Sequence, residues 1–215
     1  MFGTKDIRDV EFVVFDVETT GLAPGAGDRV VEIAALKVRD RKIVEEFHSL
    51  VDPQRSISAG AFMVNGITPQ MLSGAPKASH IMPRFLKFVE GAHLIGHNVR
   101  FDLGFVINEI GLAGLTWEKE TWAIDTVRMA RLLLPGMGSY RLWWVARSLG
   151  IEEEQQHRAL ADVYLTWRVF AKLLEVAERR DLKAPEILLK SSRRVSPSGR
   201  REGAFRQRRD ERSYE

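Results

Sequence analysis

The stretch FDVETTGL, residues 15–22, ends an apolar segment rich in valine and phenylalanine that begins at residue 10. Residues i and i+2 of a strand point to the same face, so we expect the carboxylates of Asp16 and Glu18 to project together. Two neighbouring carboxylates repel each other unless a cation or a shared proton lies between them. In a chain without cysteine, oxygen ligands suit Mg²⁺ or Mn²⁺ better than zinc. The stretch therefore predicts either a cation site at a strand end or a solvated acidic turn.

The composition is that of an ordinary soluble globular protein, with 215 residues, 45% hydrophobic and 28% charged. This length allows one sizeable core, or one domain with an appendage. The absence of cysteine excludes disulfides and argues against a secreted, disulfide-stapled fold. The first residues are highly charged and resemble no signal peptide, and the apolar run that follows is too short to span a bilayer. We therefore expect a cytoplasmic protein with no membrane partner.

The net charge of +3 is unevenly distributed along the chain. Residues 190–215 contain nine Lys and Arg residues against four Asp and Glu residues, and few apolar ones. Such a composition predicts a folded domain over residues 1–189 and a basic, disordered tail over residues 190–215. The tail has three open interpretations: it binds nucleic acid, tethers the chain to a partner, or only keeps it soluble.

Hydrophobic patterning predicts three consecutive strands over residues 10–17, 29–38 and 42–51, joined by turns into an antiparallel meander. In the second half, strands and helices alternate. This order predicts an α/β fold with a mixed five-stranded sheet flanked by helices. The remaining predicted strands cover residues 93–96 and 122–124, and the predicted helices cover residues 59–64, 81–90, 101–110, 126–134, 140–149 and 160–180.

Two more acids lie where predicted strands end or helices begin. Asp102 closes the run HNVRFD after one strand, and Asp162 closes the run HRALAD at the start of the last long helix. One edge of an α/β sheet gathers such positions into a site. Each acid alone is better explained as a first-turn residue that complements the helix dipole. Positions five apart on a helix are rotated by about 140°, so His157 and Asp162 converge only if His157 precedes the helix.

Taken together, these runs resemble the histidine-containing subtype of the DEDD family of 3′→5′ exonucleases, within the ribonuclease H-like superfamily. The resemblance covers residues 10–174 and rests on DVETTG at residues 16–21, HNVRFD at residues 97–102 and HRALAD at residues 157–162. The chain looks most similar to the proofreading epsilon subunit of bacterial DNA polymerase III and its stand-alone relatives. The resemblance implies the ribonuclease H-like fold.

The resemblance also implies an activity: metal-dependent hydrolysis of DNA from its 3′ end, releasing nucleoside 5′-monophosphates in proofreading or repair. It implies two divalent cations, Mg²⁺ or Mn²⁺, a preference for single-stranded DNA and association with a DNA polymerase subunit. No motif separates DNA from RNA, so a 3′→5′ exoribonuclease similar to ribonuclease T or oligoribonuclease remains an alternative. A non-catalytic nucleic-acid-binding or scaffold module is another, but a decayed site usually loses a ligand, and here all five expected positions are filled.

The roles of the five residues follow from the resemblance. It assigns Asp16 to both metals, Glu18 and Asp162 to the metal on the nucleophile side, and Asp102 to the other metal. His157 would be the general base for the attacking water, since an imidazole titrates close to neutral pH.

Further residues beside the motifs are expected to contact the substrate. Backbone groups after Glu18 would approach the terminal nucleotide, and large apolar side chains would either wedge against terminal bases or belong to the core. One position, Asn65, departs from relatives, which often carry a histidine that faces the substrate. The expected contacts are Thr19, Thr20, Gly21, Leu22, Phe62, Met63, Asn65, Asn98 and Phe101.

Overall fold

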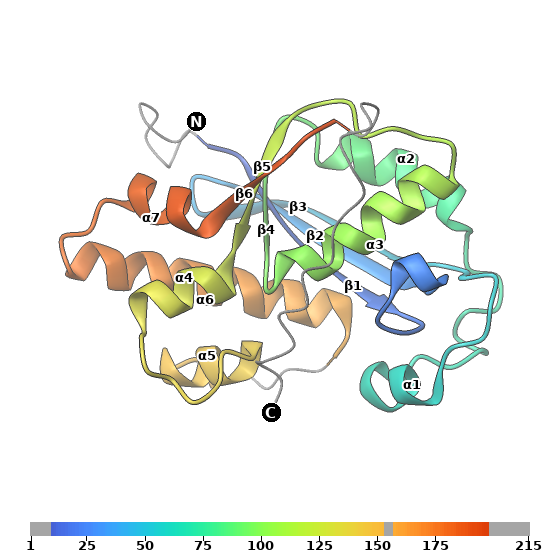
Figure 1. The fold of residues 1–215 in the computed structure, drawn as a ribbon, viewed down its shortest axis with the longest axis horizontal. Coiled ribbons are helices and arrows are strands. Elements are labelled where there is room, and N and C mark those ends of the chain that lie inside the picture. The colour runs from blue at the N-terminus through green and yellow to red at the C-terminus, as the bar shows by residue number, and fades with distance from the viewer. Residues whose placement is uncertain (1–9, 153–156, 198–215) are drawn as a thin grey trace.

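The computed structural model describes residues 10–152 and 157–197 and contains one mixed sheet with helices on both faces (Figure 1). The strand order is β3-β2-β1-β4-β5-β6. β1, β4 and β5 are parallel to one another, whereas β2, β3 and β6 each pair antiparallel with a neighbour. The strands are β1 (Phe12–Thr19), β2 (Val30–Arg39), β3 (Lys42–Leu50), β4 (His93–Gly96), β5 (Thr121–Asp125) and β6 (Ser192–Val195).

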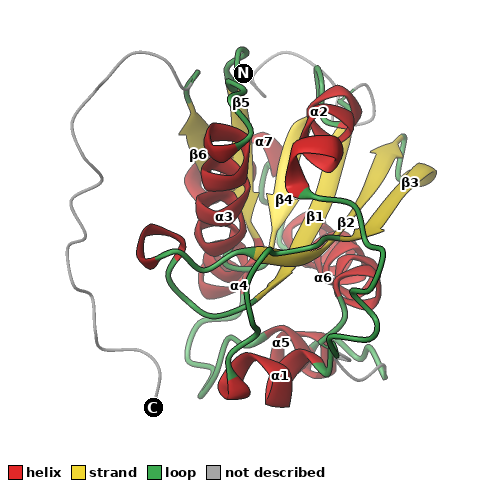
Figure 2. Ribbon diagram, turned by 90° about the vertical axis from the view of Figure 1, so that its right-hand side faces the viewer, coloured by secondary structure: helices red, strands yellow, loops and turns green. Residues whose placement is uncertain are grey.

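The helices form two layers. α2 and α3 share one buried cluster with one face of the sheet, and α4 to α7 share a second cluster with the other face. Figure 2 shows α2 and α3 on one side of the sheet and α6 on the other. Within the described ranges, no helix is both long enough and apolar enough to cross a membrane. The helices are η2 (Pro24–Ala26, a 3₁₀ turn), α1 (Ala59–Asn65), α2 (Ala78–Phe88), α3 (Val99–Leu112), α4 (Thr126–Leu133), α5 (Leu142–Ser148), α6 (Ala159–Arg179) and α7 (Ala184–Ser191).

The sheet has six strands, so the prediction of five is wrong, and the extra strand lies inside the predicted tail. β6 pairs antiparallel with β5, and Val195 is buried opposite Thr121. The boundary at residue 190 is therefore wrong as well, because the folded part extends at least to Val195. β6 was missed because a short edge strand that contains two arginines shows no apolar alternation. The prediction of disorder for residues 198–215 lies outside the described residues.

Alternation along β1 decides where its acids point. Phe12 and Val14 belong to the cluster that α6 helps to form, and Val13, Phe15 and Val17 belong to the cluster formed by α2 and α3. Even-numbered positions therefore face α6. Asp16 and Glu18 continue this series beyond Val14, toward the carboxyl end of the strand.

Candidate active site

Asp16 and Glu18 meet Asp162 at the carboxyl end of β1. Asp162 lies in the first turn of α6 and is buried. Each of the three carboxylates offers an oxygen, and these oxygens all lie within 4.8 Å of one another. The prediction that the two acids of β1 project together is consistent with this geometry, and α6 adds the third.

Asp102 reaches the same place from the opposite face of the sheet. It lies in the first turn of α3, is buried, and its Oδ1 accepts a hydrogen bond from the backbone N–H of Val17 at 3.1 Å. Val17 is the residue between Asp16 and Glu18, so this bond fixes α3 against the acidic end of β1.

Burial, together with the charges of neighbouring acids, raises the pKa of three of the four acids. Burial and the charges of Asp102, Glu18 and Asp162 raise the pKa of Asp16 well above its usual value. Burial and then the charge of Asp162 raise the pKa of Glu18 to about 8. Burial also raises the pKa of Asp102 to about 8, although the Val17 N–H favours its ionised form. Such a set of oxygens fits divalent cations, whose charge would offset the repulsion.

His157 lies on the loop directly before α6. Its backbone is left-handed, with φ of 50°, and its side chain is exposed, whereas Asp162 follows within the first helical turn. This is the arrangement under which a histidine five positions before the acid can approach the same centre. Its role as general base stays a prediction.

Glu32 belongs to the site region, although the sequence analysis assigned it no role there. It is fully buried on β2, directly opposite Glu18 in the β1–β2 register. Its carboxylate accepts hydrogen bonds from Arg158 Nε at 3.0 Å, from Arg158 Nη2 at 2.8 Å and from the N–H of Ala159 at 3.2 Å, and His48 Nε2 lies 2.8 Å away. These contacts attach the first turn of α6, which carries Asp162, to the sheet.

The environment of Glu32 is electrostatically opposite to that of Glu18. Burial alone would raise the pKa of Glu32, but the hydrogen bonds from Arg158, His48 and the Ala159 N–H outweigh it and hold the pKa below its usual value. The signal in the sequence was a single acid within the otherwise apolar run VVEIAAL, residues 30–36. Such an acid must find a partner inside the protein.

The loop after β1 is held by its own hydrogen bonds. Thr19 Oγ1 donates to the carbonyl of Gly21 at 2.6 Å, and Thr20 Oγ1 accepts from the N–H of Arg29 at 3.0 Å. A Cβ on Gly21 would lie 2.4 Å from Asp28 Oδ2, so any other residue would displace the Asp28 carboxylate. The loop is therefore rigid where contact with the terminal nucleotide was predicted.

The predicted wedge residues are exposed, which excludes the alternative that they belong to the core. Leu22 is 83% exposed, Phe62 45% and Met63 84%. α1, which carries Phe62 and Met63, is connected to the end of β1 because the N–H of Ser58 donates to the carbonyl of Thr20 at 3.1 Å. These apolar side chains are thus available to a ligand on elements that adjoin the acidic centre.

Asn65 is buried at the end of α1 and lies against the acidic strand. Its Nδ2 donates to the carbonyl of Thr19 at 3.2 Å, and its Oδ1 accepts from the N–H of Ile67 at 3.0 Å. Its side chain also acts to lower the pKa of Glu18, against the stronger effect of burial. The structure thus gives Asn65 a supporting place beside Glu18, and its contact with the substrate stays a prediction.

Asn98 and Phe101 flank Asp102 at the start of α3. Asn98 has a left-handed backbone, with φ of 63°, and its N–H donates to Asp125 Oδ1 at 3.1 Å. Phe101 is half-buried and packs against Phe105, with ring centroids 5.0 Å apart. The contacts of Asn98 and Phe101 with the substrate also stay predictions.

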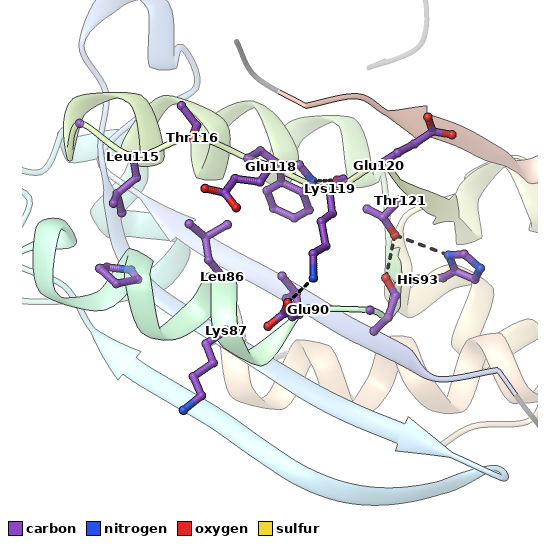
Figure 3. Close-up of a pocket in the computed structure, with 16 residues that line it drawn as sticks. Leu86, Lys87, Glu90, His93, Leu115, Thr116, Glu118, Lys119, Glu120 and Thr121 are labelled. Atoms are coloured by element: carbon purple, nitrogen blue, oxygen red, sulfur yellow. Dashed lines mark hydrogen bonds and ion pairs between the residues drawn. The ribbon is translucent and has the colours of Figure 1, made fainter.

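A pocket of about 610 Å³ lies elsewhere, beside the starts of β4 and β5 (Figure 3). Lys119 forms an ion pair with Glu90 there, and Thr121 Oγ1 donates to the carbonyl of Ala92 at 2.7 Å. The acids lie at the carboxyl end of β1, whereas the pocket lies at the amino ends of β4 and β5. Because β1, β4 and β5 are parallel, the pocket and the acidic centre lie at opposite ends of these strands. None of the predicted site residues lines this pocket.

The fold and the acidic centre define a class: a ribonuclease H-like α/β protein with a cluster of carboxylates suited to divalent cations. A family model described as "Exonuclease" matches residues 13–170. The chain therefore belongs to the exonuclease family.

Relatives with curated names are much longer than this chain. A DNA polymerase III of the PolC type from Caldanaerobacter subterraneus is 36% identical over 174 residues, which is 81% of this chain and 12% of the relative. The 3′-5′ exonuclease DinG of Bacillus subtilis is 35% identical over 185 residues, which is 86% of this chain and 19% of DinG. The similarity thus concerns one part of each relative.

Two solved structures extend the comparison. Exonuclease X in complex with 5′ overhanging duplex DNA is 27% identical, with a TM-score of 0.63, covering 84% of this chain and 99% of that one. A zinc-bound complex of E. coli exonuclease I with single-stranded DNA is 26% identical, with a TM-score of 0.69, covering 80% of this chain and 42% of that one.

Proposed function

We propose that this chain is a divalent-metal-dependent 3′→5′ exonuclease that acts on the 3′ end of DNA and releases nucleoside 5′-monophosphates. The observation that carries the proposal is the meeting of Asp16, Glu18 and Asp162, whose oxygens lie within 4.8 Å of one another. Asp102, which is buried, adds a fourth carboxylate to the same centre. Hydrolysis of a phosphodiester develops negative charge, and an uncompensated acidic centre opposes that reaction unless it holds cations.

Asp16, Glu18, Asp102 and Asp162 are the residues that would hold Mg²⁺ or Mn²⁺. When bound there, two such ions would neutralise charge at the phosphate and lower the pKa of a bound water. The protein positions the four carboxylates in advance through β1, the Val17–Asp102 hydrogen bond and the attachment of α6 to Glu32. Preorganisation of this kind reduces the cost of assembling the charged centre during the reaction.

His157 would take the proton of the attacking water. An imidazole suits this step because it changes protonation near neutral pH. Its place on the loop before α6 leaves the ring exposed next to the turn that carries Asp162. The exposed Leu22, Phe62 and Met63 would contact the bases at the 3′ end, and the rigid backbone of residues 19–21 would contact the terminal nucleotide.

DNA is favoured over RNA by the relatives. The two solved structures described above contain DNA, one as single strand and one as duplex with a 5′ overhang. Because this chain resembles one part of PolC-type polymerases, action beside a polymerase subunit in the cytoplasm is part of the proposal.

The test offers the full chain three substrates labelled at the 5′ end: single-stranded DNA, a duplex with a 3′ mismatch, and RNA of the same sequence. Each is incubated with Mg²⁺, Mn²⁺ or chelator, with Asp16→Asn as the matched inactive control. We expect stepwise shortening of the single-stranded DNA and loss of activity in chelator. Inertness on all three substrates with either metal would overturn the proposal.

A further inference from the structure

Two adjacent tryptophans lie on α5, the short helix that precedes the loop to α6. The rings of Trp143 and Trp144 stack on each other, with centroids 4.3 Å apart and an interplanar angle of 25°. Trp144 is 44% exposed, whereas Val145 and Ala146 of the same helix are buried in the core. α5 therefore presents a large flat ring to the surface, supported by a second ring, and such a ring is available to a ligand.

α5 lies at the same end of the molecule as the acidic centre. Ile95 of β4 pairs in parallel with Val14 of β1. Two positions further along, His97 and Asp16 therefore lie at the same end of the two strands. His97 Nε2 is 2.8 Å from the carbonyl oxygen of Tyr140, two residues before α5 begins. Figures 1 and 2 both show α5 at the end of the molecule that also carries α1. A DNA strand held at the acidic centre can thus extend across α5.

The surroundings of Trp144 are cationic. Arg141 precedes it by three residues and Arg147 follows it by three, and side chains at this spacing are neighbours on a helix surface. Both arginines are exposed, and within the part of the chain that the structure describes neither guanidinium forms an ion pair. The run over residues 126–151 contains four arginines and no aspartate or glutamate. This surface therefore favours a partner that combines flat rings with negative charge.

We propose that Trp144, supported by Trp143, stacks on a base of the substrate strand, upstream of the nucleotide that is removed. Arg141 and Arg147 then lie beside the phosphates of the same strand. The inference rests on the proposed function, because it requires the 3′ end to lie at the acidic centre. Every base has a π-face, so an aromatic platform retains a single strand whatever its sequence, and arginines beside the platform attract the phosphates.

Three variants separate stacking from a mere loss of apolar surface. Trp144→Ala removes the ring, and Trp144→Phe keeps a flat ring in its place. Leu112→Ala is the control for lost apolar surface, because Leu112 is 62% exposed and ends α3, whose first turn carries Asp102. The control thus lies about 20 Å of helix away from the acidic centre.

The probe is a single-stranded 20-nucleotide oligothymidylate labelled at its 5′ end, titrated with the full chain in Ca²⁺, a cation that takes oxygen ligands. We expect Trp144→Ala to bind it about tenfold more weakly than the wild type, the size of the stacking contribution of one base. Trp144→Phe and Leu112→Ala should bind close to the wild type.

A second series of probes lacks one base at a time near the 3′ end but keeps every phosphate. Wild-type binding should weaken when the base that stacks on Trp144 is missing. Trp144→Ala should lose this sensitivity at that position and keep it at the terminal nucleotide, which other residues contact.

Three results would overturn the inference: wild-type affinity in Trp144→Ala, an equal loss in Trp144→Ala and Leu112→Ala, or unchanged sensitivity of Trp144→Ala to every missing base. Thermal melting identifies a loss that comes from misfolding. If Trp144→Ala is destabilised, Trp144→Leu, which keeps apolar surface without a π-face, repeats the comparison with Trp144→Phe.

Activity separates this inference from the proposed function. If the protein binds the probe through Trp144 but shortens it in neither Mg²⁺ nor Mn²⁺, the stacking site stands and the exonuclease is refuted. If the protein shortens the probe and Trp144→Ala binds and shortens it like the wild type, the stacking site alone is refuted.

Discussion

This protein contains two kinds of buried or partly buried carboxylate, and they lie on the same strands and helices. Glu32 and Glu109 are buried, and each forms a bidentate pair with an arginine. Glu109 accepts hydrogen bonds from Arg29 Nε at 2.8 Å and from Arg29 Nη2 at 2.7 Å. Glu32 accepts from Arg158 Nε and Nη2 in the same way. By contrast, burial and the charges of its acidic neighbours raise the pKa of Asp16. The first kind connects elements of the fold, and the second forms a centre whose oxygen ligands suit divalent cations.

The two kinds are connected through the helices. Glu109 belongs to α3, which also carries Asp102, and it accepts the N–H of Val30 at the start of β2 at 3.0 Å. Glu32, in β2, accepts from Arg158 and Ala159 at the start of α6, which carries Asp162. Each helix that brings an acid to the centre is thus fixed to β2 by a glutamate–arginine pair. The arginine-paired glutamates thus position the acids of the centre.

The largest expected effect is a loss of activity, which should follow replacement of an acid of the centre but not of an arginine-paired glutamate. Asp16→Asn should reduce kcat/KM on single-stranded DNA by about 10³-fold or more, because several kcal/mol of charge stabilisation depend on the cations. In chelator the same variant should melt at a higher temperature than the wild type, since one repelling charge is gone. An active Asp16→Asn protein, or one destabilised in chelator, would contradict the assignment.

Replacement of His157 tests whether this residue acts as a general base or as a metal ligand. His157→Ala should lower kcat on the order of 10²-fold, the usual contribution of a general base. Mn²⁺ binding, measured by calorimetry, should stay at the wild-type level because His157 is not assigned as a ligand. Loss of Mn²⁺ binding would instead make His157 a metal ligand.

The paired glutamates should show the opposite pattern to Asp16. Glu109→Ala is expected to lower the free energy of unfolding by about 2 kcal/mol, measured with urea, because Arg29 and the Val30 N–H lose their partner. Glu32→Ala should cost about as much, since Arg158 and the Ala159 N–H are left without theirs. If either substitution left stability unchanged while Asp16→Asn destabilised the protein, the comparison between the two kinds of carboxylate would be reversed.

The smallest effect is a pH dependence of the protein without metal. The pKa values of Glu18 and Asp102 are raised to about 8 from usual values of 4.5 and 3.8, so the folded state binds more protons than the unfolded state between these limits. The free energy of unfolding in chelator should therefore fall as pH rises from about 5 to 8. Mg²⁺ should flatten this profile, and a profile that rises in chelator would contradict the shifts.

The sequence predicted the acidic centre because its signals are local. Alternation in β1 placed Asp16 and Glu18 on one face, and the loop before α6 allowed His157 to precede Asp162. The supporting pairs were not predictable, because Arg158 lies 126 residues from Glu32 and Glu109 lies 80 residues from Arg29, and no local pattern couples such positions. β6 escaped prediction for a similar reason: its pairing with β5 is a tertiary contact.

Mn²⁺ titration by calorimetry, at pH 8 and in the absence of DNA, tests most directly whether the repelling carboxylates form a metal centre. The comparison is between Asp162→Asn, which removes a charge from the centre, and Glu109→Gln, which removes a charge from a structural pair on the other side of β1. The account predicts that the wild type and Glu109→Gln bind Mn²⁺ alike, whereas Asp162→Asn binds it at least tenfold more weakly. Equal binding by Asp162→Asn and the wild type would contradict it.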